Sequence, residues 1–509
     1  MDLRIDKDSE QPIYEQIRRQ IVQLVRDGLL PPGSKIPSVR QLALKLGVGK
    51  NTVSQAYDEL SAESIIETRH GSGTYITDSP GIAIEHNLRS QKENGNGEAG
   101  QKMRWDPYNF RSEFFGLPRS PRDEELIDFT QASPDPELFP FERIKQVSAN
   151  MLWYPKEFFF DRGNAQGYQP LVEHLEKQMA LSGVAMAEGE NDIIITAGFR
   201  RALDLILGFI LQPGQKVAVE VPSYSGLLNV LIAKRVGIEP VPMDSEGMDT
   251  AYLEGLVRRG EISAVITIPT YHNPTGITMS QARREHLLEI AARYNLPIIE
   301  DDWGRELRYE GVAPPPLKAM DTGGHVIHIG TYSKVFLPGL RIGWMTIPSE
   351  IAVPQVRAKM GLDSSDSYFL QSLLHEFIIK GHFAKHVRKT LKEYKKRRNL
   401  MVDALNAHLP PGCSFVEPHG GFSLWLNLPE NIQSLPLLGL ARKADVDFTP
   451  ANMMMPERND MNGLRLSFSR VSPDDIEEGI KALCSVIKDC IDNPALLKGG
   501  AHDFEDLYK

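Results

Sequence analysis

A lysine flanked by hydroxyl groups and an arginine is the strongest chemical signal in the 509-residue sequence. Lys334 comes just after a short apolar run that predicts a strand, Thr331 and Ser333 precede it, and Arg341 follows it by seven residues. A lysine amine can form a Schiff base with an aldehyde, while hydroxyl groups and a guanidinium group can hold a phosphate. Taken alone, such a lysine and arginine would be interpreted as solvated loop residues. A functional interpretation therefore depends on the other residues near them in the predicted fold.

Polar residues also end two other predicted strands. Asn273 follows the strand expected at 264–268, and Asp301 and Asp302 end the strand expected at 297–300. An amide can donate to a phenolic oxygen, and a carboxylate can keep a pyridinium nitrogen protonated, which makes the ring an electron sink. Carboxylates at strand ends can also be plain helix caps. Caps do not explain the order Asn, Asp, Lys, Arg, which predicts a pyridoxal 5'-phosphate site with an internal aldimine at Lys334.

Three further segments extend this predicted site. Gly198, Phe199 and Arg200 lie between a predicted strand and a helix whose N-terminal amides can bind phosphate. Tyr224 follows the next strand and could stack on the cofactor, with ordinary core packing as the alternative. Arg465 lies on a late predicted strand and suits a ligand carboxylate.

The elements that must position these residues alternate along the chain. Short β-branched runs separated by helical stretches lie at 192–196, 216–221, 264–268, 297–300, 326–329 and 343–347. This alternation predicts an α/β fold with a largely parallel sheet. From about Gly361 a smaller lobe is expected, opening with a long basic helix and ending in a strand at 464–468.

The basic helix of that lobe is expected at 383–400. We interpret it as a solvated helix face, with a secondary DNA contact as the alternative. Its basic residues are Lys385, Arg388, Lys389, Lys392, Lys395, Lys396, Arg397 and Arg398.

Residues 11–77 form a compact pattern of three helices and a short hairpin. Pro37 and Ser38 begin the second helix, and the third runs from about 51 to 60 with Val53, Tyr57 and Leu60 buried. Residues 33–57 contain four basic residues and no acidic one. In a helix-turn-helix, the start of the third helix meets bases and phosphates. The residues predicted to contact DNA here are Lys35, Ser38, Arg40, Lys50, Asn51, Thr52 and Gln55.

Residues 68–76 predict a hairpin wing, in which Gly71 and Gly73 let the backbone approach the minor groove. Helix order, turn, basic stretch and wing together predict a winged helix that binds a double-stranded DNA operator. A protein-binding winged helix with a solvated basic face is the alternative.

Composition limits the class of protein. Hydrophobic residues make up 41% and charged residues 24% of the chain, as in ordinary globular proteins. The net charge of -10 excludes a protein that coats nucleic acid by bulk electrostatics, so DNA contact must come from a local patch. The charged N-terminus, the absence of a long apolar run and three cysteines without disulfide or metal-ligand spacing predict a cytoplasmic protein.

A change of composition separates the expected domains. The stretch 79–125 begins with polar, glycine-containing sequence poor in large apolar residues, which is typical of a flexible linker. The prediction is therefore a winged-helix domain at 1–78, a linker at 79–125 and a cofactor domain at 126–495, with its small lobe at about 361–495.

These motifs resemble two known families. The N-terminal arrangement closely resembles GntR-type winged helices, and residues 128–487 resemble fold-type I aminotransferases, including the Ser-Pro-Asp-Pro motif that begins at Ser133. Their fusion resembles MocR-type (GabR-like) regulators over nearly the whole chain. The resemblance implies a homodimer and these roles: Lys334 forms the Schiff base, Asp301 rather than Asp302 pairs with the ring nitrogen, Asn273 contacts the phenolic oxygen, Tyr224 stacks, and Arg465 binds the effector carboxylate.

Three departures from these families bear on the site. Trp303 stands where a tyrosine usually contacts the phenolic oxygen, and an indole can only donate one hydrogen bond. Phe199 and Arg200 replace a small hydroxyl residue and a glutamine in the phosphate cup, which removes one phosphate ligand that Arg200 is expected to replace. Ser64 replaces a glycine before the wing.

Two functions follow from the sequence. The first is a transcription regulator whose pyridoxal-phosphate domain senses an amine, an amino acid or a vitamer of the cofactor. The second is a working aminotransferase with an accessory DNA-binding domain. The fused winged helix favours the first, because catalysis alone gives no reason for it.

Overall fold

The computed structural model describes residues 3, 5, 12–26, 30, 33–62, 65–69, 72–77, 126–160, 163–457 and 462–497. The chain divides into two units, one within Met1–Phe110 and one within Arg111–Lys509. The predicted linker at 79–125 lies outside the described residues. Among the helices that are described, none combines the length and apolarity needed to cross a membrane.

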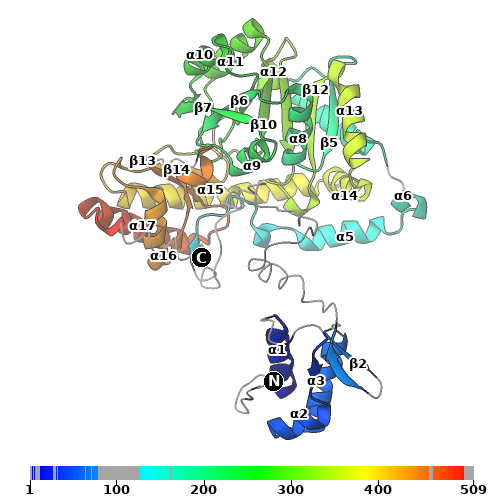
Figure 1. Cartoon of the computed structure of the whole chain (residues 1–509). Coiled ribbons are helices and arrows are strands. Elements are labelled where there is room, and N and C mark those ends of the chain that lie inside the picture. Colours follow the sequence, from blue (N-terminus) through cyan, green and yellow to red (C-terminus); the bar gives the residue numbers. More distant parts are fainter. Residues whose placement is uncertain are drawn as a thin grey trace, which may run out of the picture. The chain divides into compact units, whose positions relative to one another are not determined.

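The N-terminal unit is a winged helix, as predicted (Figure 1). Its helices are α1 (Ile13–Arg26), α2 (Val39–Leu46) and α3 (Lys50–Ala62). Strands β1 (Lys35–Ile36), β2 (Ile66–Arg69) and β3 (Gly73–Ile76) form an antiparallel sheet in the order β1-β3-β2. Ile17, Ile21, Val53 and Leu60 are fully buried between the helices, so their helical spacing forms the core.

Local signals fix both ends of α2. The Ser38 side chain accepts from the backbone N–H of Gln41, and the Gln41 side chain bonds back to the Ser38 N–H, which is a capping box. Gly47 ends α2 in the left-handed conformation, with φ of 64°. Helix α3 therefore starts at Lys50, close to the predicted start.

The second unit contains an eight-stranded sheet in the order β5-β12-β11-β10-β9-β6-β7-β8. It is parallel except for β12 and β8, which run against their neighbours. All six predicted strands are present. The strands are β5 (Asn191–Thr196), β6 (Lys216–Val221), β7 (Gly237–Asp244), β8 (Gly247–Met248), β9 (Ala264–Thr267), β10 (Ile298–Asp302), β11 (Val326–Thr331) and β12 (Gly343–Pro348).

Strand β7 is not among the predicted strands, because Pro240 and Pro242 interrupt its apolar pattern. Its ladder to β6 covers residues 237–242, whereas its pairing with β8 involves only Met243 and Asp244. A proline has no backbone N–H to donate. Both prolines are tolerated because β7 has no ladder partner at these positions on the side away from β6, so no N–H donor is needed there.

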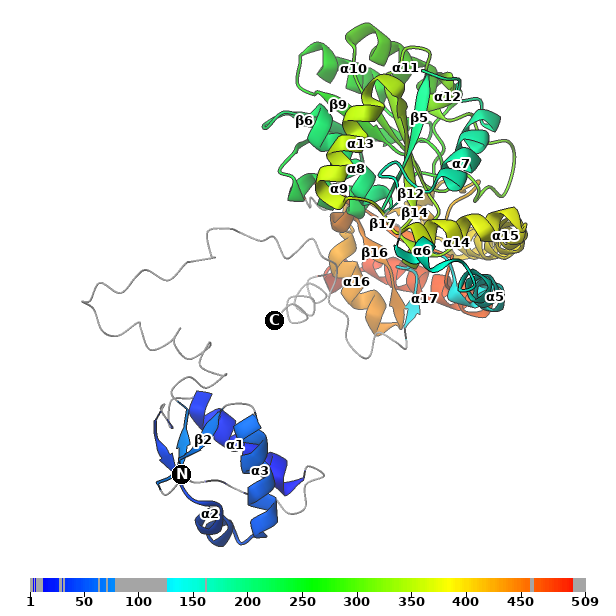
Figure 2. The ribbon, with the colours of Figure 1, turned by 90° about the vertical axis from the view of Figure 1, so that its right-hand side faces the viewer.

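Helices cover both faces of this sheet, as a parallel sheet requires. Figure 2 shows α8, α9 and α13 on one side and α7 and α12 on the other. Alternation along each strand supplies both cores: Val217, Val219 and Ile299 pack toward α8 and α9, while Ala218 and Ile298 pack toward α10 and α11. The helices that precede the smaller lobe in the chain, not all of which cover the sheet, are α5 (Phe141–Met151), α6 (Lys156–Phe160), α7 (Gln169–Leu181), α8 (Phe199–Ile210), α9 (Ser225–Ala233), α10 (Thr250–Arg258), α11 (Gln281–Tyr294), α12 (Leu317–Met320) and α13 (Ser349–Asp363).

A smaller lobe follows, but the expected boundary near Gly361 falls inside α13. The lobe also continues beyond its predicted last strand into a further helix. Strand β4 (Ile127–Asp128) pairs with β15 (Val446–Asp447), so the start of this unit joins the lobe. The lobe contains α14 (Tyr368–Ile379), α15 (His382–His408), α16 (Ser434–Lys443), α17 (Pro473–Asp492), and a sheet of β13 (Ser414–Phe415), β14 (Ser423–Asn427), β17 (Gly463–Ser467) and β16 (Thr449–Pro450).

The basic helix α15 corrects one expectation. Most of its lysines are exposed, but Arg397 and Arg398 are buried rather than solvated. Arg397 forms an ion pair with Asp135 at 2.8 Å and donates to the Ser469 carbonyl. Arg398 bonds Glu310 and Glu417. These two arginines therefore join α15 to the segments that contain Asp135 and Glu310, and take no part in a solvated face.

The Arg397–Asp135 pair supplies the first prediction. Arg397→Met leaves the Asp135 carboxylate buried without its cation, so we expect a loss of about 3–5 kcal/mol in the free energy of unfolding. Lys396→Met, one residue earlier and exposed, is the matched control and should change stability by less than about 0.5 kcal/mol. Denaturant unfolding measures both, and equal stabilities would show that the buried pair does not matter.

Candidate functional site

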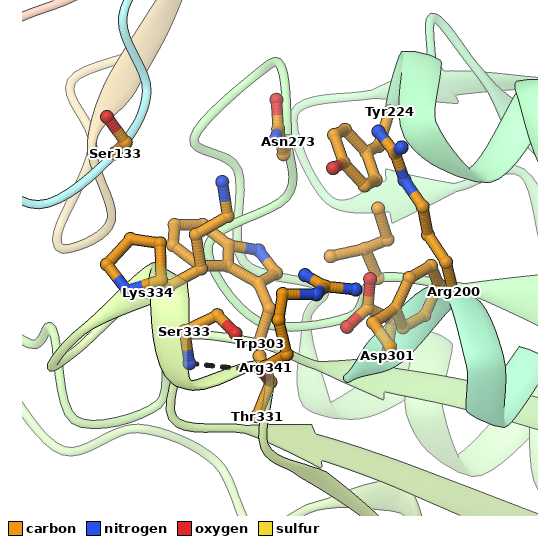
Figure 3. Close-up of a pocket in the computed structure, with 13 residues that line it drawn as sticks. Ser133, Arg200, Tyr224, Asn273, Asp301, Trp303, Thr331, Ser333, Lys334 and Arg341 are labelled. Carbon is orange, nitrogen blue, oxygen red and sulfur yellow. Dashed lines mark hydrogen bonds between the residues drawn. The ribbon is translucent and has the colours of Figure 1, made fainter. Parts of the chain in front are cut away.

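The predicted cofactor residues meet in one cavity of about 240 Å³ at the carboxyl ends of the sheet strands (Figure 3). Ten of the eleven predicted cofactor residues line it, and Gly198 lies directly behind Arg341. Parallel strands bring their carboxyl ends to one edge, which is why residues distant in sequence converge there. The lining consists of Ser133, Phe199, Arg200, Tyr224, Ile268, Asn273, Asp301, Trp303, Thr331, Ser333, Lys334, Pro338 and Arg341.

Lys334 reaches this cavity from the segment that follows β11. Its Nζ donates to the carbonyl of Ala132 at 2.9 Å and lies 5.9 Å from the centre of the Tyr224 ring. Burial lowers the pKa of Lys334, and the nearby Arg465 cation also lowers it, whereas Tyr224 and Asp301 raise it. The net downward shift favours the neutral amine, which is the nucleophilic form.

Asp301 occupies the end of β10, a strand paired on both sides. Burial raises the pKa of Asp301 well above its usual range, and the adjacent Asp302 raises it further. Its Oδ1 atom is buried and has no hydrogen-bond partner within the described residues. A carboxylate oxygen left in this state requires a donor or a cation, which a protonated ring nitrogen would supply.

The orientation of Asn273 follows from its neighbour. Arg465 Nη1 lies 3.3 Å from Asn273 Oδ1. Because a guanidinium can only donate, the amide oxygen must face Arg465, which leaves the amide nitrogen for an acceptor in the cavity. Asn273 therefore presents the donor that a phenolic oxygen needs.

The position of Arg465 differs from the one expected for a residue that contacts a ligand directly in the cavity. It does not line the cavity, and it is 7% exposed. Its Nη2 donates to the Thr130 carbonyl at 2.6 Å and to Thr449 Oγ1 at 3.0 Å. Burial lowers the pKa of Arg465 to about 10. Its effector-binding role stays a prediction, and a ligand carboxylate would have to compete with these contacts.

A group of donors at one end of the cavity suits a phosphate. Gly198, with φ of 85°, caps α8, and Arg341 Nη2 donates to the Ala197 carbonyl at 2.9 Å beside it. The Ser333 Oγ atom is buried and finds no partner in the described part of the chain. Free amides at the N-terminus of α8 add further donors. Arg200, in the first turn of α8, also lines the cavity, and its side chain extends toward Tyr224 (Figure 3).

Tyr224 and Trp303 form aromatic walls of the cavity. Burial raises the pKa of Tyr224, but Lys334 and Arg200 lower it more, so the net shift is downward. The Trp303 Nε1 atom is buried without a partner among residues placed by the structure. The unpaired atoms of Asp301, Ser333 and Trp303 together fit a polar aromatic phosphate.

Three lining residues are additions to the predicted site. Ser133 belongs to the Ser-Pro-Asp-Pro motif, which by itself indicates only the family resemblance. Ile268 ends a predicted strand, and Pro338 lies between Lys334 and Arg341. A place at a strand end or between two site residues is the signal that could have identified Ile268 and Pro338.

The predicted DNA-binding residues lie on the winged helix as follows. Arg40, Lys50, Asn51 and Gln55 are exposed on α2 and α3, and Thr52 is half-buried. Ser38 is engaged as the cap of α2. The Lys35 side chain lies against Gly73 and over the Tyr75 ring. Gly71 and Ser64 lie outside the described residues.

Comparisons with known proteins agree with this division. Residues 13–76 match the family described as bacterial regulatory proteins, gntR family, and residues 134–483 match aminotransferase class I and II. The HTH-type transcriptional regulator YdfD of Bacillus subtilis is 32% identical over 94% of this chain and 97% of its own. The probable rhizopine catabolism regulatory protein MocR of Rhizobium meliloti is 28% identical, covering 95% of each.

This chain belongs to the MocR-type regulators. It is a DNA-binding transcription regulator that joins a GntR domain to an aminotransferase-like domain, as the sequence predicted. The aminotransferase-like part of this MocR-type regulator is also similar to the kynurenine aminotransferase of Pyrococcus horikoshii, solved in complex with PMP. The two share 34% identity with a TM-score of 0.69, covering 75% of this chain and 98% of the other.

Close backbone packing beneath the phosphate end supplies a prediction. A Cβ on Gly343 would lie 2.9 Å from the Gly330 carbonyl oxygen and 3.0 Å from Gly198 Cα. Gly343→Ala should therefore move the α8 N-terminus and cost about 1–3 kcal/mol of stability. Gly339→Ala, where nothing lies within 4 Å of the added Cβ, is the control. Thermal unfolding should separate the two, and an unchanged melting temperature for Gly343→Ala would contradict this packing argument.

Proposed function

We propose that this regulator binds pyridoxal 5'-phosphate at Lys334 and reports an amine, an amino acid or a vitamer to its DNA-binding domain. The observation that carries the proposal is the meeting of Lys334, Asp301, Asn273 and a phosphate cup in one cavity. The GntR domain in the same chain supports a role in which ligand binding at this site controls DNA binding.

Each of these cavity residues would contact a different part of the cofactor. The Lys334 amine would attach at the aldehyde carbon, Asp301 would pair with the ring nitrogen, and the Asn273 amide would donate to the phenolic oxygen. Pyridoxal phosphate supplies an electron-withdrawing ring when bound. A protonated ring nitrogen would give the buried Asp301 oxygen a donor and would stabilise its ionised form, which in turn favours the protonated ring.

The phosphate would be held by neutral and charged donors together. These donors are Thr331, Ser333, Arg341, Arg200 and the α8 amides that follow Gly198. Tyr224 would stack on the ring, and Trp303 would donate its single N–H where a tyrosine is usual. Arg200 would supply the phosphate ligand that the Phe199 side chain cannot provide.

Ligand sensing would act through the segment that leads out of the linker. Lys334 and Arg465 donate to the carbonyls of Ala132 and Thr130. An amino group that takes over Lys334's place, or a carboxylate that engages Arg465, competes with these bonds. A ligand shifts an equilibrium only through such differential contacts, so residues 130–132 are where effector chemistry would reach the linker.

We also propose that the regulator is a homodimer acting in the cytoplasm, where a bacterial regulator meets its DNA. Large apolar side chains are exposed in the short stretch from 152 to 160. Trp153 is 90% and Phe160 is 85% exposed, and Leu152 and Phe159 are exposed beside them. An apolar cluster of this kind usually marks a protein interface, and a second copy would cover it.

A second candidate function is catalysis as an aminotransferase. It is supported by the complete set of Lys334, Asp301 and Asn273, and by similarity to the Pyrococcus horikoshii kynurenine aminotransferase. The two functions differ in turnover: an enzyme exchanges amino groups between donor and keto acid repeatedly, whereas a sensor needs only one reversible event per signal.

The cofactor proposal is tested by absorbance. The full chain incubated with pyridoxal phosphate should show a visible band that borohydride abolishes, because the Lys334 amine has attached to the aldehyde. Lys334→Ala should lack this band, and Lys385→Ala, which removes an exposed lysine, should keep it. A wild-type protein without the band, or a Lys334→Ala protein that shows the same borohydride-sensitive band, would refute attachment at Lys334.

The DNA-binding surface gives a separate prediction. Arg40→Ala should weaken binding to random-sequence duplex DNA and reduce the salt-dependence slope by about 1, because one cation that neutralises a phosphate is removed. Arg19→Ala is the control, because Arg19 lies on α1 and pairs with Glu15 at 3.2 Å. Fluorescence anisotropy over a salt series measures both slopes. Equal slopes for the two variants would exclude Arg40 from the interface.

A further inference from the structure

A second and larger cavity, of about 600 Å³, lies behind the cofactor cavity. Helix α7, the end of β10, strands β11 and β12, and the first turns of α15 contribute its walls. Neighbouring residues of a strand point to opposite faces. Asp301 therefore faces the cofactor cavity, while Asp302 faces the second one.

Buried polar atoms without partners make this cavity a built site. Asp302 Oδ1, Arg305 Nη2 and Trp344 Nε1 are all buried, and none has a hydrogen-bond partner within the described ranges. The residues that carry them are fixed: Arg305 Nε pairs with Asp302 Oδ2 at 2.6 Å, and Arg305 Nη1 donates to the Pro314 carbonyl at 2.6 Å. One acceptor and two donors are thus held in place with nothing to bind.

The Trp344 ring is held by equally specific packing. It crosses Gly330 on the neighbouring strand, where an added Cβ would lie 2.1 Å from the ring. The Tyr332 ring lies 5.2 Å from it and contacts Phe383 of α15 in turn. The indole N–H therefore has a fixed position in the wall.

The chemistry of the walls defines the ligand. Asp302 and Arg305 carry opposite charges in this wall and balance each other, whereas burial raises the pKa of Glu306 to about 7 and Arg388 is exposed on α15. Leu175, Met179 and Phe383 supply an apolar surface beside them. A ligand that satisfies both an acceptor and two donors while keeping charge balanced is a zwitterion with an apolar body.

We propose that this second cavity binds an amino acid with a large apolar side chain, with its ammonium group on Asp302 and its carboxylate on Arg305 and the Trp344 N–H. This site is separate from the cofactor cavity and does not depend on attachment at Lys334. The regulator then has two ligand sites back to back across β10.

The test uses L-phenylalanine as the probe and the full chain after treatment with pyridoxal phosphate and borohydride, which leaves no exchangeable carbonyl at Lys334. Isothermal titration calorimetry should detect binding at millimolar concentration or below. Phenethylamine lacks the carboxylate and 3-phenylpropanoate lacks the ammonium group, so each should bind at least about tenfold more weakly.

Three variants locate the binding. Ala384→Trp fills the cavity from the exposed face of α15 and should abolish binding, and Asp302→Asn should weaken it at least about tenfold. Ala407→Trp, exposed farther along the same helix, should leave it unchanged. The proposal is overturned if L-phenylalanine does not bind, if Ala384→Trp and Asp302→Asn both bind it as wild type does, or if either single-charge analogue binds equally well.

Discussion

Burial of ionisable groups around the cofactor cavity is the constraint on which the rest of this regulator depends. Lys334, Asp301 and Arg465 are all removed from water within one neighbourhood. Such groups are costly unless they meet partners. The sheet fixes β10 between β9 and β11, and Arg465 fixes the Asn273 amide, so the polar groups are held where a ligand can pair with them. A cavity whose polar atoms are fixed before a ligand arrives loses little entropy on binding.

Sequence reasoning succeeds where a signal is local. The order of Asn273, Asp301, Lys334 and Arg341 at strand ends is enough to predict their convergence, because parallel strands share an edge. It fails where the decisive partner is remote: the burial of Arg397 and Arg398 depends on Asp135, Glu310 and Glu417, which no spacing connects to α15. It also treats Asp301 and Asp302 as alternatives for one role, whereas strand alternation gives them opposite faces.

The segment that follows the linker ties the two cofactor-domain lobes to the site. Carbonyl groups from Thr130 to Ser133 accept bonds from Arg465, Lys334 and the hydroxyl groups of Ser467 and Ser469. Two of these four donors are the residues expected to engage an effector. Under the proposed sensing function, the bonds that order this segment are therefore the ones that a ligand would exchange.

Asp302 links the two cavities electrostatically as well as through the strand. Its charge raises the pKa of Asp301, because two adjacent carboxylates resist ionising together. In the proposed complex, the ligand's ammonium group on Asp302 would offset that charge and so would lower the pKa of Asp301, while its carboxylate on Arg305 would act in the opposite direction. An ionised Asp301 holds a protonated ring nitrogen more firmly than a neutral one. If the proposed amino acid binds in the second cavity and the effect of its ammonium group is the larger, it would therefore strengthen cofactor binding in the first, and linkage would require the cofactor to strengthen binding in the second by the same factor.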